Sequence, residues 1–230
     1  MRIVTFAALV LLAAPAVAAE RNYSVTSFNR VRVDGPYQVT VKTNVAPFAR
    51  ASVSQAALDG VSIRVEERTL IVRADTSGGW GGYPGEGRGP VTIELGTHDL
   101  TTAWVNGAGA LFIDKVKGLS FDLAIQGAGV MRIDSADVDQ LKIGLSGTAS
   151  ARLAGRAAKL TATIRGSSSL DAESLAVKDA VIGAEGPAMI RANVTGTAKV
   201  DALGLASVAL AGSPSCTTKS QGSASITGCR

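Results

Sequence analysis

The chain has few of the side chains on which most enzymes depend. Its 230 residues include one histidine and two cysteines, and aromatic residues make up only 4% of them. A single histidine makes a zinc site implausible. The sequence G-x-S-x-G, which would indicate a nucleophilic serine, does not occur. We therefore predict no catalytic residues, no metal and no cofactor.

An excess of positive charge is also missing. The formal net charge is +4, and acidic and basic residues are interspersed along the chain. Proteins that bind nucleic acid usually carry a basic block, or a basic patch with aromatic residues between the charges. Neither occurs here, so we do not expect a nucleic-acid partner.

Long apolar runs are absent apart from one at the N-terminus. Arg2 precedes the apolar residues 3–12, and the small residues 16–19 follow. This order is typical of a secretory signal peptide, and the run is short for a transmembrane helix, which needs about 20 residues. We predict that residues 1–19 are removed on export. The mature chain would then have no transmembrane segment and would lie in the periplasm, on the cell surface or outside the cell. The alternative is an N-terminal membrane anchor.

The two cysteines, Cys216 and Cys229, both lie near the C-terminus. In an exported protein an even pair predicts a disulfide, and two free thiols are the alternative. Closing so short a loop would stabilise the fold by about 3 kcal/mol.

A repeat of about 20 residues runs through the middle of the chain. Its glycines are Gly107, Gly127, Gly147, Gly166 and Gly186. On both sides of each glycine, apolar residues alternate with mostly polar ones, which indicates strands with one buried face. Each repeat is then expected to hold two short strands, joined by a tight turn at the glycine and linked to the next repeat by a longer turn near residues 115–118 or 136–139.

Stacked repeats of this kind predict an all-β fold, a parallel β-helix (β-solenoid) with rungs of about 20 residues. Residues 20–230 would form one domain. Residues 20–100 are its less regular stranded N-terminal region, 101–195 the regular rungs, and 196–230 the C-terminal rungs with a cap clipped by the disulfide. In the last part, Gly196, Gly204 and Gly212 are expected to open compact rungs. A sandwich of antiparallel strands is the alternative.

The stretch VNGAGALFID at residues 105–114 has the glycine spacing of a phosphate-binding loop. Such a loop needs a third glycine and a following helix, but position 112 is Phe112 and the residues around it alternate as a strand. Gly107 is therefore interpreted as a turn residue.

Outward positions of the repeat supply the candidate binding residues. Arg132, Arg152 and Arg191 occupy equivalent positions and could meet an anionic glycan or surface, whereas Asp171 between them could simply relieve their repulsion. Asp114 and Asp134 are also equivalent, so stacking would place them about 4.8 Å apart. They are interpreted as a weak cation site or as solvated turn residues.

A glycine-rich stretch, SGGWGGYPGEGRGP at residues 77–90, carries Trp80 and Tyr83. We expect a flexible surface loop. Its aromatic residues could stack on sugars or anchor a protein partner, or they could fold back onto the body.

The order of these motifs resembles a known family. The opening FNRVRVDGPYQVTV contains Val31, Val33, Gly35, Val39 and Val41, and is followed by the serial glycine motifs and by AGSPSCTTKSQGSASI. Together they resemble the head GIN domain of bacterial autotransporter adhesins over almost all of the mature chain. The resemblance implies a right-handed parallel β-helix with a stranded N-terminal region, and it implies no chemistry.

The sequence thus predicts an exported, non-enzymatic envelope or surface protein that binds a glycan or a protein partner through its solenoid surface. Many parallel β-helices are polysaccharide lyases or hydrolases, so such an enzyme is one alternative. A structural component of the envelope is the other.

Overall fold

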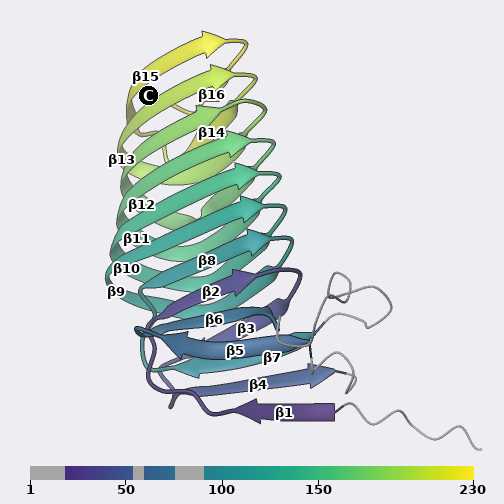
Figure 1. Cartoon of the computed structure of the whole chain (residues 1–230). Helices are drawn as coiled ribbons and strands as arrows, with labels where there is room; N and C mark the ends of the chain where they lie inside the picture. The colour runs from purple at the N-terminus through teal and green to yellow at the C-terminus, as the bar shows by residue number, and fades with distance from the viewer. Residues whose placement is uncertain (1–18, 54–59, 76–90) are drawn as a thin grey trace, which may run out of the picture.

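The computed structural model describes residues 19–53, 60–75 and 91–230, and the regular elements of these residues are all β-strands. The chain winds as a right-handed solenoid, with its first and last strands at opposite ends (Figure 1). Most neighbouring strands pair in parallel. The prediction of an all-β parallel β-helix is confirmed, and the antiparallel sandwich is excluded.

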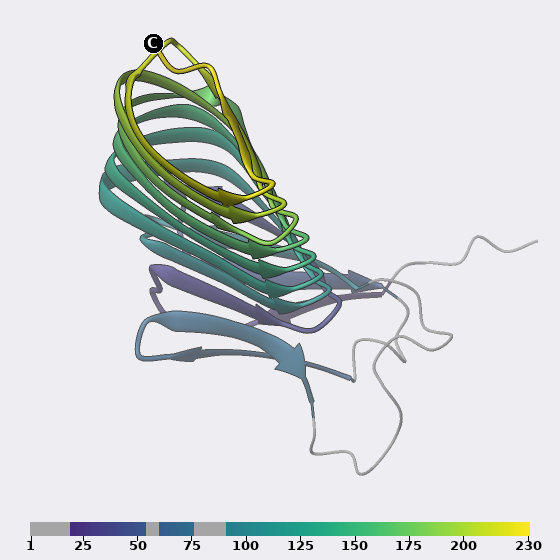
Figure 2. The same cartoon turned by 90° about the horizontal axis from the view of Figure 1, so that it is seen from above.

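Five long strands make the central rungs, and each runs almost once around the solenoid, as the view from above shows (Figure 2). They are β9 (Ala110–Gly127), β10 (Val130–Gly147), β11 (Ser150–Gly166), β12 (Ser169–Glu185) and β13 (Met189–Gly204).

The expectation of two short strands per rung is therefore wrong. The chain bends where the longer turns were predicted, but pairing resumes beyond the bend after local register shifts. These shifts lie between Ile133 and Ala136 of β10, between Arg152 and Ala154 of β11, and between Ala172 and Asp179 of β12. Because successive rungs bend at the same place, their backbone groups stay opposite one another and remain paired.

The N-terminal region is less regular, as predicted. Its strands are β1 (Ala19–Tyr23), β2 (Arg30–Asp34), β3 (Gln38–Thr43), β4 (Phe48–Val53), β5 (Val61–Glu66), β6 (Thr69–Ala74), β7 (Thr92–Thr97) and β8 (Thr102–Gly107). β2 pairs with β8 and β3 with β9, so these two short strands form a full rung beneath the regular ones. The antiparallel pairs β1–β4, β4–β7 and β5–β6 then close this end of the solenoid, which shields the edge of the parallel sheet.

The C-terminal end consists of β14 (Ser207–Ala211), β15 (Ser215–Gly222) and β16 (Ser225–Thr227). β14 and β15 both stack on β13, and β16 stacks on β14. Cys216 and Cys229 form the predicted disulfide. The cross-link joins the start of β15 to the end of the chain and so clips the last rung.

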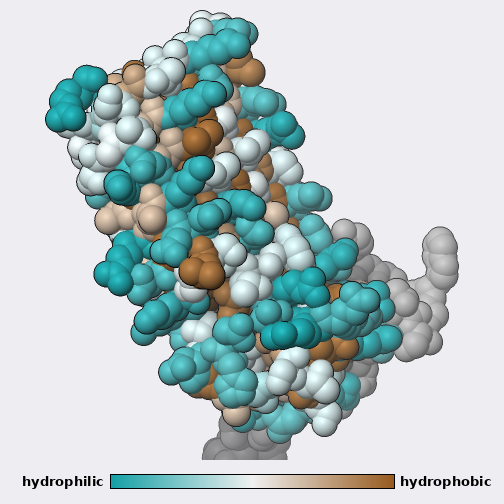
Figure 3. All heavy atoms as spheres, turned by 90° about the vertical axis from the view of Figure 1, so that its left-hand side faces the viewer, coloured by the Kyte–Doolittle hydropathy of each residue, from teal (hydrophilic) through white to brown (hydrophobic). Residues whose placement is uncertain are grey.

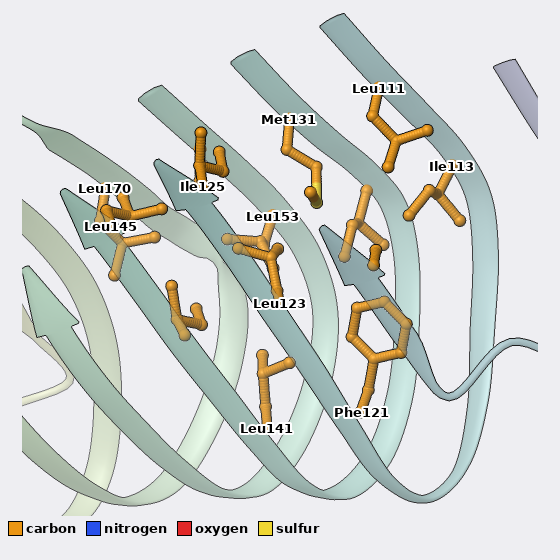
Figure 4. Packing of buried hydrophobic residues seen from close by; sticks show 14 of the residues in the cluster. Leu111, Ile113, Phe121, Leu123, Ile125, Met131, Leu141, Leu145, Leu153 and Leu170 are labelled. Carbon is orange, nitrogen blue, oxygen red and sulfur yellow. The ribbon is translucent and has the colours of Figure 1, made fainter. Parts of the chain in front are cut away.

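The interior is filled by the aliphatic side chains that the alternation predicts (Figure 4). Ile125 before the turn and Met131 and Ile133 after it are at most 1% exposed. Thr101 is an exception. The alternation that buries Ala103 and Val105 would place it inward, but it precedes β8 and is only partly buried, and its hydroxyl donates to the Asn29 carbonyl.

Glycines with positive φ form a column along one corner of the solenoid. They are Gly35, Gly107, Gly127, Gly147, Gly166, Gly186, Gly204 and Gly222. Gly204 therefore opens a rung as expected, but Gly196 and Gly212 do not. They approach the backbones of Lys178 and Val194 outside the column.

The glycine column divides the surface into two flanks. The pre-glycine flank comprises β6, β2 and β8, the second halves of β9 to β13, and β15. The post-glycine flank comprises β7 and β3, the first halves of β9 to β13, and then β14 and β16. Side chains that occupy equivalent positions in successive rungs form rows along each flank.

Candidate functional site

The predicted arginines lie in one row of the post-glycine flank. Arg132 is opposite Arg152, Arg152 opposite Asp171, and Asp171 opposite Arg191. The three arginines are exposed. This row arises because rungs of nearly equal length bring equivalent outward residues into register.

Two arginines of the row have carboxylate partners. Arg132 Nε lies 2.6 Å from Asp134 Oδ1, and Arg152 Nη2 lies 2.7 Å from Asp171 Oδ2. The hydrogen bond from Arg152 lowers the pKa of Asp171, and the charge of Arg191 lowers it further. Asp171 thus offsets the repulsion between its arginine neighbours.

Arg191 differs from the other two because the described part of the chain places no carboxylate within ion-pair distance of it. It borders a shallow depression of ≈ 290 Å³ that Arg152, Asp171 and the half-exposed Met189 also line. An exposed guanidinium group can pair with a carboxylate, sulfate or phosphate through two parallel hydrogen bonds. An anionic group that entered this depression would lie beside the Arg191 guanidinium group.

Other outward carboxylates are also held by the neighbouring rung. Asp137 accepts hydrogen bonds from Arg156 Nε and Nη2 at 2.7 and 3.0 Å, which lower its pKa. Asp179 accepts from the Thr197 hydroxyl at 2.6 Å and from the Thr197 backbone N–H at 3.1 Å, and its pKa is lowered too. These groups stabilise the stack as anions, whereas a general acid needs a raised pKa.

The two carboxylates considered for a cation site have separate partners. Asp114 Oδ1 accepts from the Thr43 backbone N–H at 3.0 Å and from the Thr43 hydroxyl at 3.2 Å. Asp134 is paired with Arg132. Within residues 19–53, 60–75 and 91–230, no group of three or more metal-ligating side chains occurs.

A second hollow, which the repeat analysis did not identify, lies on the pre-glycine flank. It measures ≈ 660 Å³ and is lined by residues of β2, β5, β6, β8 and β9 together with the β5–β6 turn. The lining residues are Arg32, Glu66, Glu67, Thr69, Ile71, Trp104, Asn106 and Gln126. A signal was present in the sequence, because Trp104 is a large aromatic residue at an outward position of the alternation, between the buried Ala103 and Val105.

Hydrogen bonds organise the polar side of this hollow. Asp34 Oδ1 accepts from Arg32 Nε at 2.9 Å and from Asn106 Nδ2 at 2.6 Å. Arg32 and Asn106 are on adjacent strands, so one carboxylate fixes both side chains beside Trp104.

The remaining predicted residues divide into two groups. Trp80 and Tyr83 lie outside the described residues, and so do residues 1–18 of the predicted signal peptide 1–19. The predicted turn glycines, from Gly107 to Gly186, all lie in the glycine column and serve the fold. In the described part of the chain there is no helix of the length and hydrophobicity that crossing a membrane requires.

Exposed apolar side chains are spread over the molecule. The large ones among the described residues are Val45, Leu119, Val130, Val181, Met189 and Leu205, and they come from different rungs. On the side drawn in Figure 3, hydrophobic residues are interspersed with hydrophilic ones. On this side, the surface of the described residues is therefore mixed rather than dominated by one apolar patch.

Comparisons with known proteins agree on the fold. A family model described as "Putative auto-transporter adhesin, head GIN domain" matches residues 27–214. No curated protein matches the chain.

Several solved structures share this architecture at low sequence identity. A protein of Bacteroides fragilis described as a putative adhesin has a TM-score of 0.82 at 18% identity, over 92% of this chain and 96% of that one. A protein of Parabacteroides distasonis described as a putative lipid binding protein has a TM-score of 0.70 at 15% identity, with the same coverage. A protein of Parabacteroides merdae described as a putative adhesin has a TM-score of 0.68 at 16% identity, again over 92% and 96% of the two chains.

Proposed function

Because the chain belongs to the family described as "Putative auto-transporter adhesin, head GIN domain", we propose that it is an exported, non-enzymatic protein that binds a glycan or a protein partner. It acts in the periplasm, on the cell surface or outside the cell. The disulfide supports an oxidising compartment.

The observation that carries this proposal is the register of outward side chains along a rigid stack. Arg152, Asp171 and Arg191 occupy consecutive rungs, spaced by about 4.8 Å as neighbouring strands are. Repetition of this kind gives an extended surface on which weak contacts add up, as repeat proteins use for binding. A ligand that lies along the axis meets several side chains at once.

The state of the carboxylates favours binding over catalysis. Polysaccharide hydrolases need one protonated carboxyl group near neutral pH, and lyases often hold calcium between carboxylates. Asp137, Asp171 and Asp179 instead have lowered pKa values and hydrogen bonds to neighbouring rungs. Their environment stabilises the charged form, which suits a structural role.

The test measures binding and turnover on the same preparation. Residues 20–230 are produced with the disulfide formed and applied to arrays of neutral and anionic glycans and to immobilised envelope proteins. We expect saturable binding to at least one of these surfaces and no release of oligosaccharide from any polysaccharide, with or without calcium. Turnover that is lost in the Asp114→Asn/Asp134→Asn variant would overturn the proposal in favour of the enzyme.

A matched pair of charge reversals tests the arginine row. Arg191→Glu should weaken binding to an anionic ligand, whereas Arg165→Glu, an exposed arginine of the opposite flank, should not. Equal effects of the two variants would show that the row has no special part in binding. Export is tested separately, by mass spectrometry of the exported protein, which should begin at residue 20.

A further inference from the structure

We propose that the hollow around Trp104 is a binding site for a neutral oligosaccharide. The indole ring of Trp104 stacks on the face of one sugar ring, and the amide groups of Asn106 and Gln126 pair with sugar hydroxyls. This inference rests on the proposed function and deepens it, since it assigns a ligand class and a site on the flank opposite the arginine row.

The first argument is the position of Trp104. β8 buries Ala103 and Val105, so Trp104 between them points outward and is only partly covered. Tryptophan is large and mostly apolar, and a solvent-facing position on a strand leaves part of its surface in water at a cost. A sugar face, which carries C–H groups, would cover that surface, while the indole N–H remains able to hydrogen-bond.

The second argument is the shape of the flank beside the ring. In the row that contains Trp104, Arg32 lies on one side, and Ala124 followed by Gly144 lies on the other. A Cβ atom added to Gly144 would meet nothing within 4 Å. The side chains on the C-terminal side of the ring are therefore small or absent. An oligosaccharide stacked on Trp104 has room to continue across the next rungs.

The third argument is the set of polar groups. Asp34 accepts hydrogen bonds from the Arg32 Nε–H group and from the side-chain amide of Asn106. Within residues 19–53, 60–75 and 91–230, no side chain pairs with the terminal nitrogens of Arg32 or with the carbonyl oxygen of Asn106, and Gln126 of the next rung adds another amide. Donors and acceptors placed around an aromatic surface match the vicinal hydroxyls of a sugar, which both donate and accept.

The charge of the hollow favours neutral glycans over anionic ones. Its lining contains one arginine, Arg32, and two exposed glutamates, Glu66 and Glu67, while Asp34 lies directly behind. Arg30, which donates to the Glu67 carbonyl, adds a second guanidinium group nearby. Three carboxylates against two guanidinium groups leave a net negative charge, which disfavours a polyanion. The chemistry therefore fits neutral sugars, whereas the depression beside Arg191 fits anionic ones.

The experiment uses the intrinsic fluorescence of Trp104. The chain has two tryptophans, so a Trp80→Phe background leaves Trp104 as the only tryptophan, and it is excited at the red edge, where tyrosine does not absorb. Cellohexaose, maltohexaose, mannohexaose and chitohexaose serve as neutral probes, and oligogalacturonate as the anionic probe. We expect at least one neutral probe to change the Trp104 emission saturably and oligogalacturonate to leave it unchanged.

Variants in the otherwise unchanged chain, measured by calorimetry, complete the test. Trp104→Ala should weaken the affinity for that neutral probe at least about tenfold, as for a typical aromatic anchor. Trp104→Phe should retain part of the affinity, and Gln126→Ala should lower it. Phe112→Ala, which removes an outward, partly covered aromatic residue of the post-glycine flank, is the matched control and should bind like the parent chain.

Three results would overturn the inference. They are binding of none of the neutral probes, unchanged affinity in Trp104→Ala, and an equal loss in Phe112→Ala. The array measurements under the proposed function distinguish the two claims. Array binding that Trp104→Ala leaves intact refutes this site alone, whereas a chain that binds nothing on the arrays refutes both. Circular dichroism and thermal melting confirm that each variant is folded.

Discussion

A Cβ atom on Gly127 would lie 2.8 Å from the carbonyl oxygen of Gly107, the glycine one rung below it. Both residues have positive φ, +110° for Gly127 and +98° for Gly107. Each turn of the column thus requires a backbone conformation that L side chains rarely adopt. At Gly127, Gly147, Gly166 and Gly222 the preceding rung also approaches too closely for a side chain, since a Cβ atom would lie 3.0 Å or less from its carbonyl oxygen.

Replacing a glycine of this column should be costly. We expect Gly127→Ala to lower the free energy of unfolding by about 1 to 3 kcal/mol, since it forces a strained φ and a contact with backbone. The measurement is the midpoint of urea unfolding. Gly144→Ala is the control, because its φ is not positive and its Cβ would meet open space. It should change stability by less than about 0.5 kcal/mol. Similar losses in the two variants would contradict this account of the column.

A charged side chain in the interior should prevent folding at any rung. Ile125 is fully buried, and an aspartate there would have no partner, at a cost of several kcal/mol. We expect Ile125→Asp to be insoluble or unfolded, as judged by soluble yield and circular dichroism. Gln126→Asp, one residue away on the outside, should fold normally. A folded Ile125→Asp protein would show that the core is not packed as described.

The disulfide should stabilise mainly the C-terminal end. Closing a loop of 13 residues between Cys216 and Cys229 contributes about 3 kcal/mol at most by the loop-entropy argument. We expect the Cys216→Ser/Cys229→Ser variant to show faster hydrogen exchange in residues 207–230, while β10 and β11 keep their protection. Faster exchange throughout the solenoid would indicate that the cap governs the stability of the whole stack.

Acid should weaken the contacts between rungs. The folded-state pKa values of Asp137, Asp171 and Asp179 are lowered by hydrogen bonds from Arg156, Arg152 and Thr197 respectively. A lowered folded pKa adds stability above the unfolded value, near 3.9 for aspartate, and this stability is lost as the pH falls through the folded values.

We therefore expect the free energy of unfolding to be steady above about pH 5 and to fall below about pH 4. NMR titration should give the three aspartates midpoints below the unfolded value. The Asp171→Asn variant should show a shallower acid loss than the parent chain. Midpoints at or above the unfolded value would contradict the proposed pairing.

Much of the fold was predictable from local pattern. The alternation around Gly127 and Gly147 identified the buried residues of both neighbouring strands, because a strand presents alternate residues to the core whatever it pairs with. The repeat identified the stacking, since a single rung cannot bury its inner face.

The column of glycines was only partly foreseen. Gly35 lies beneath Gly107, but β4 to β7 separate them in the chain, so no repeat spacing links the two. At the other end, Gly222 rather than Gly212 stacks on Gly204. Spacing alone did not show which glycine of the shortened rungs stands at the corner.

The candidate site depended more heavily on contacts between distant segments. The sequence placed Arg132, Arg152 and Arg191 in a row, but it did not show that Asp134 and Asp171 pair with two of them and leave the third without a carboxylate. The hollow around Trp104 was missed because its lining comes from β2, the β5–β6 hairpin, β8 and β9. Those segments meet only when the rung of β2 inserts beneath β8.

By itself, then, the sequence determined the strands, the buried faces, the repeat and the cysteine pair, because each follows from periodicity or composition within short stretches. The tertiary structure alone decided which glycines share a corner, which charges pair across rungs and which outward residues gather around Trp104. All three depend on the register between neighbouring strands. That register depends on the number of residues between equivalent positions of successive rungs.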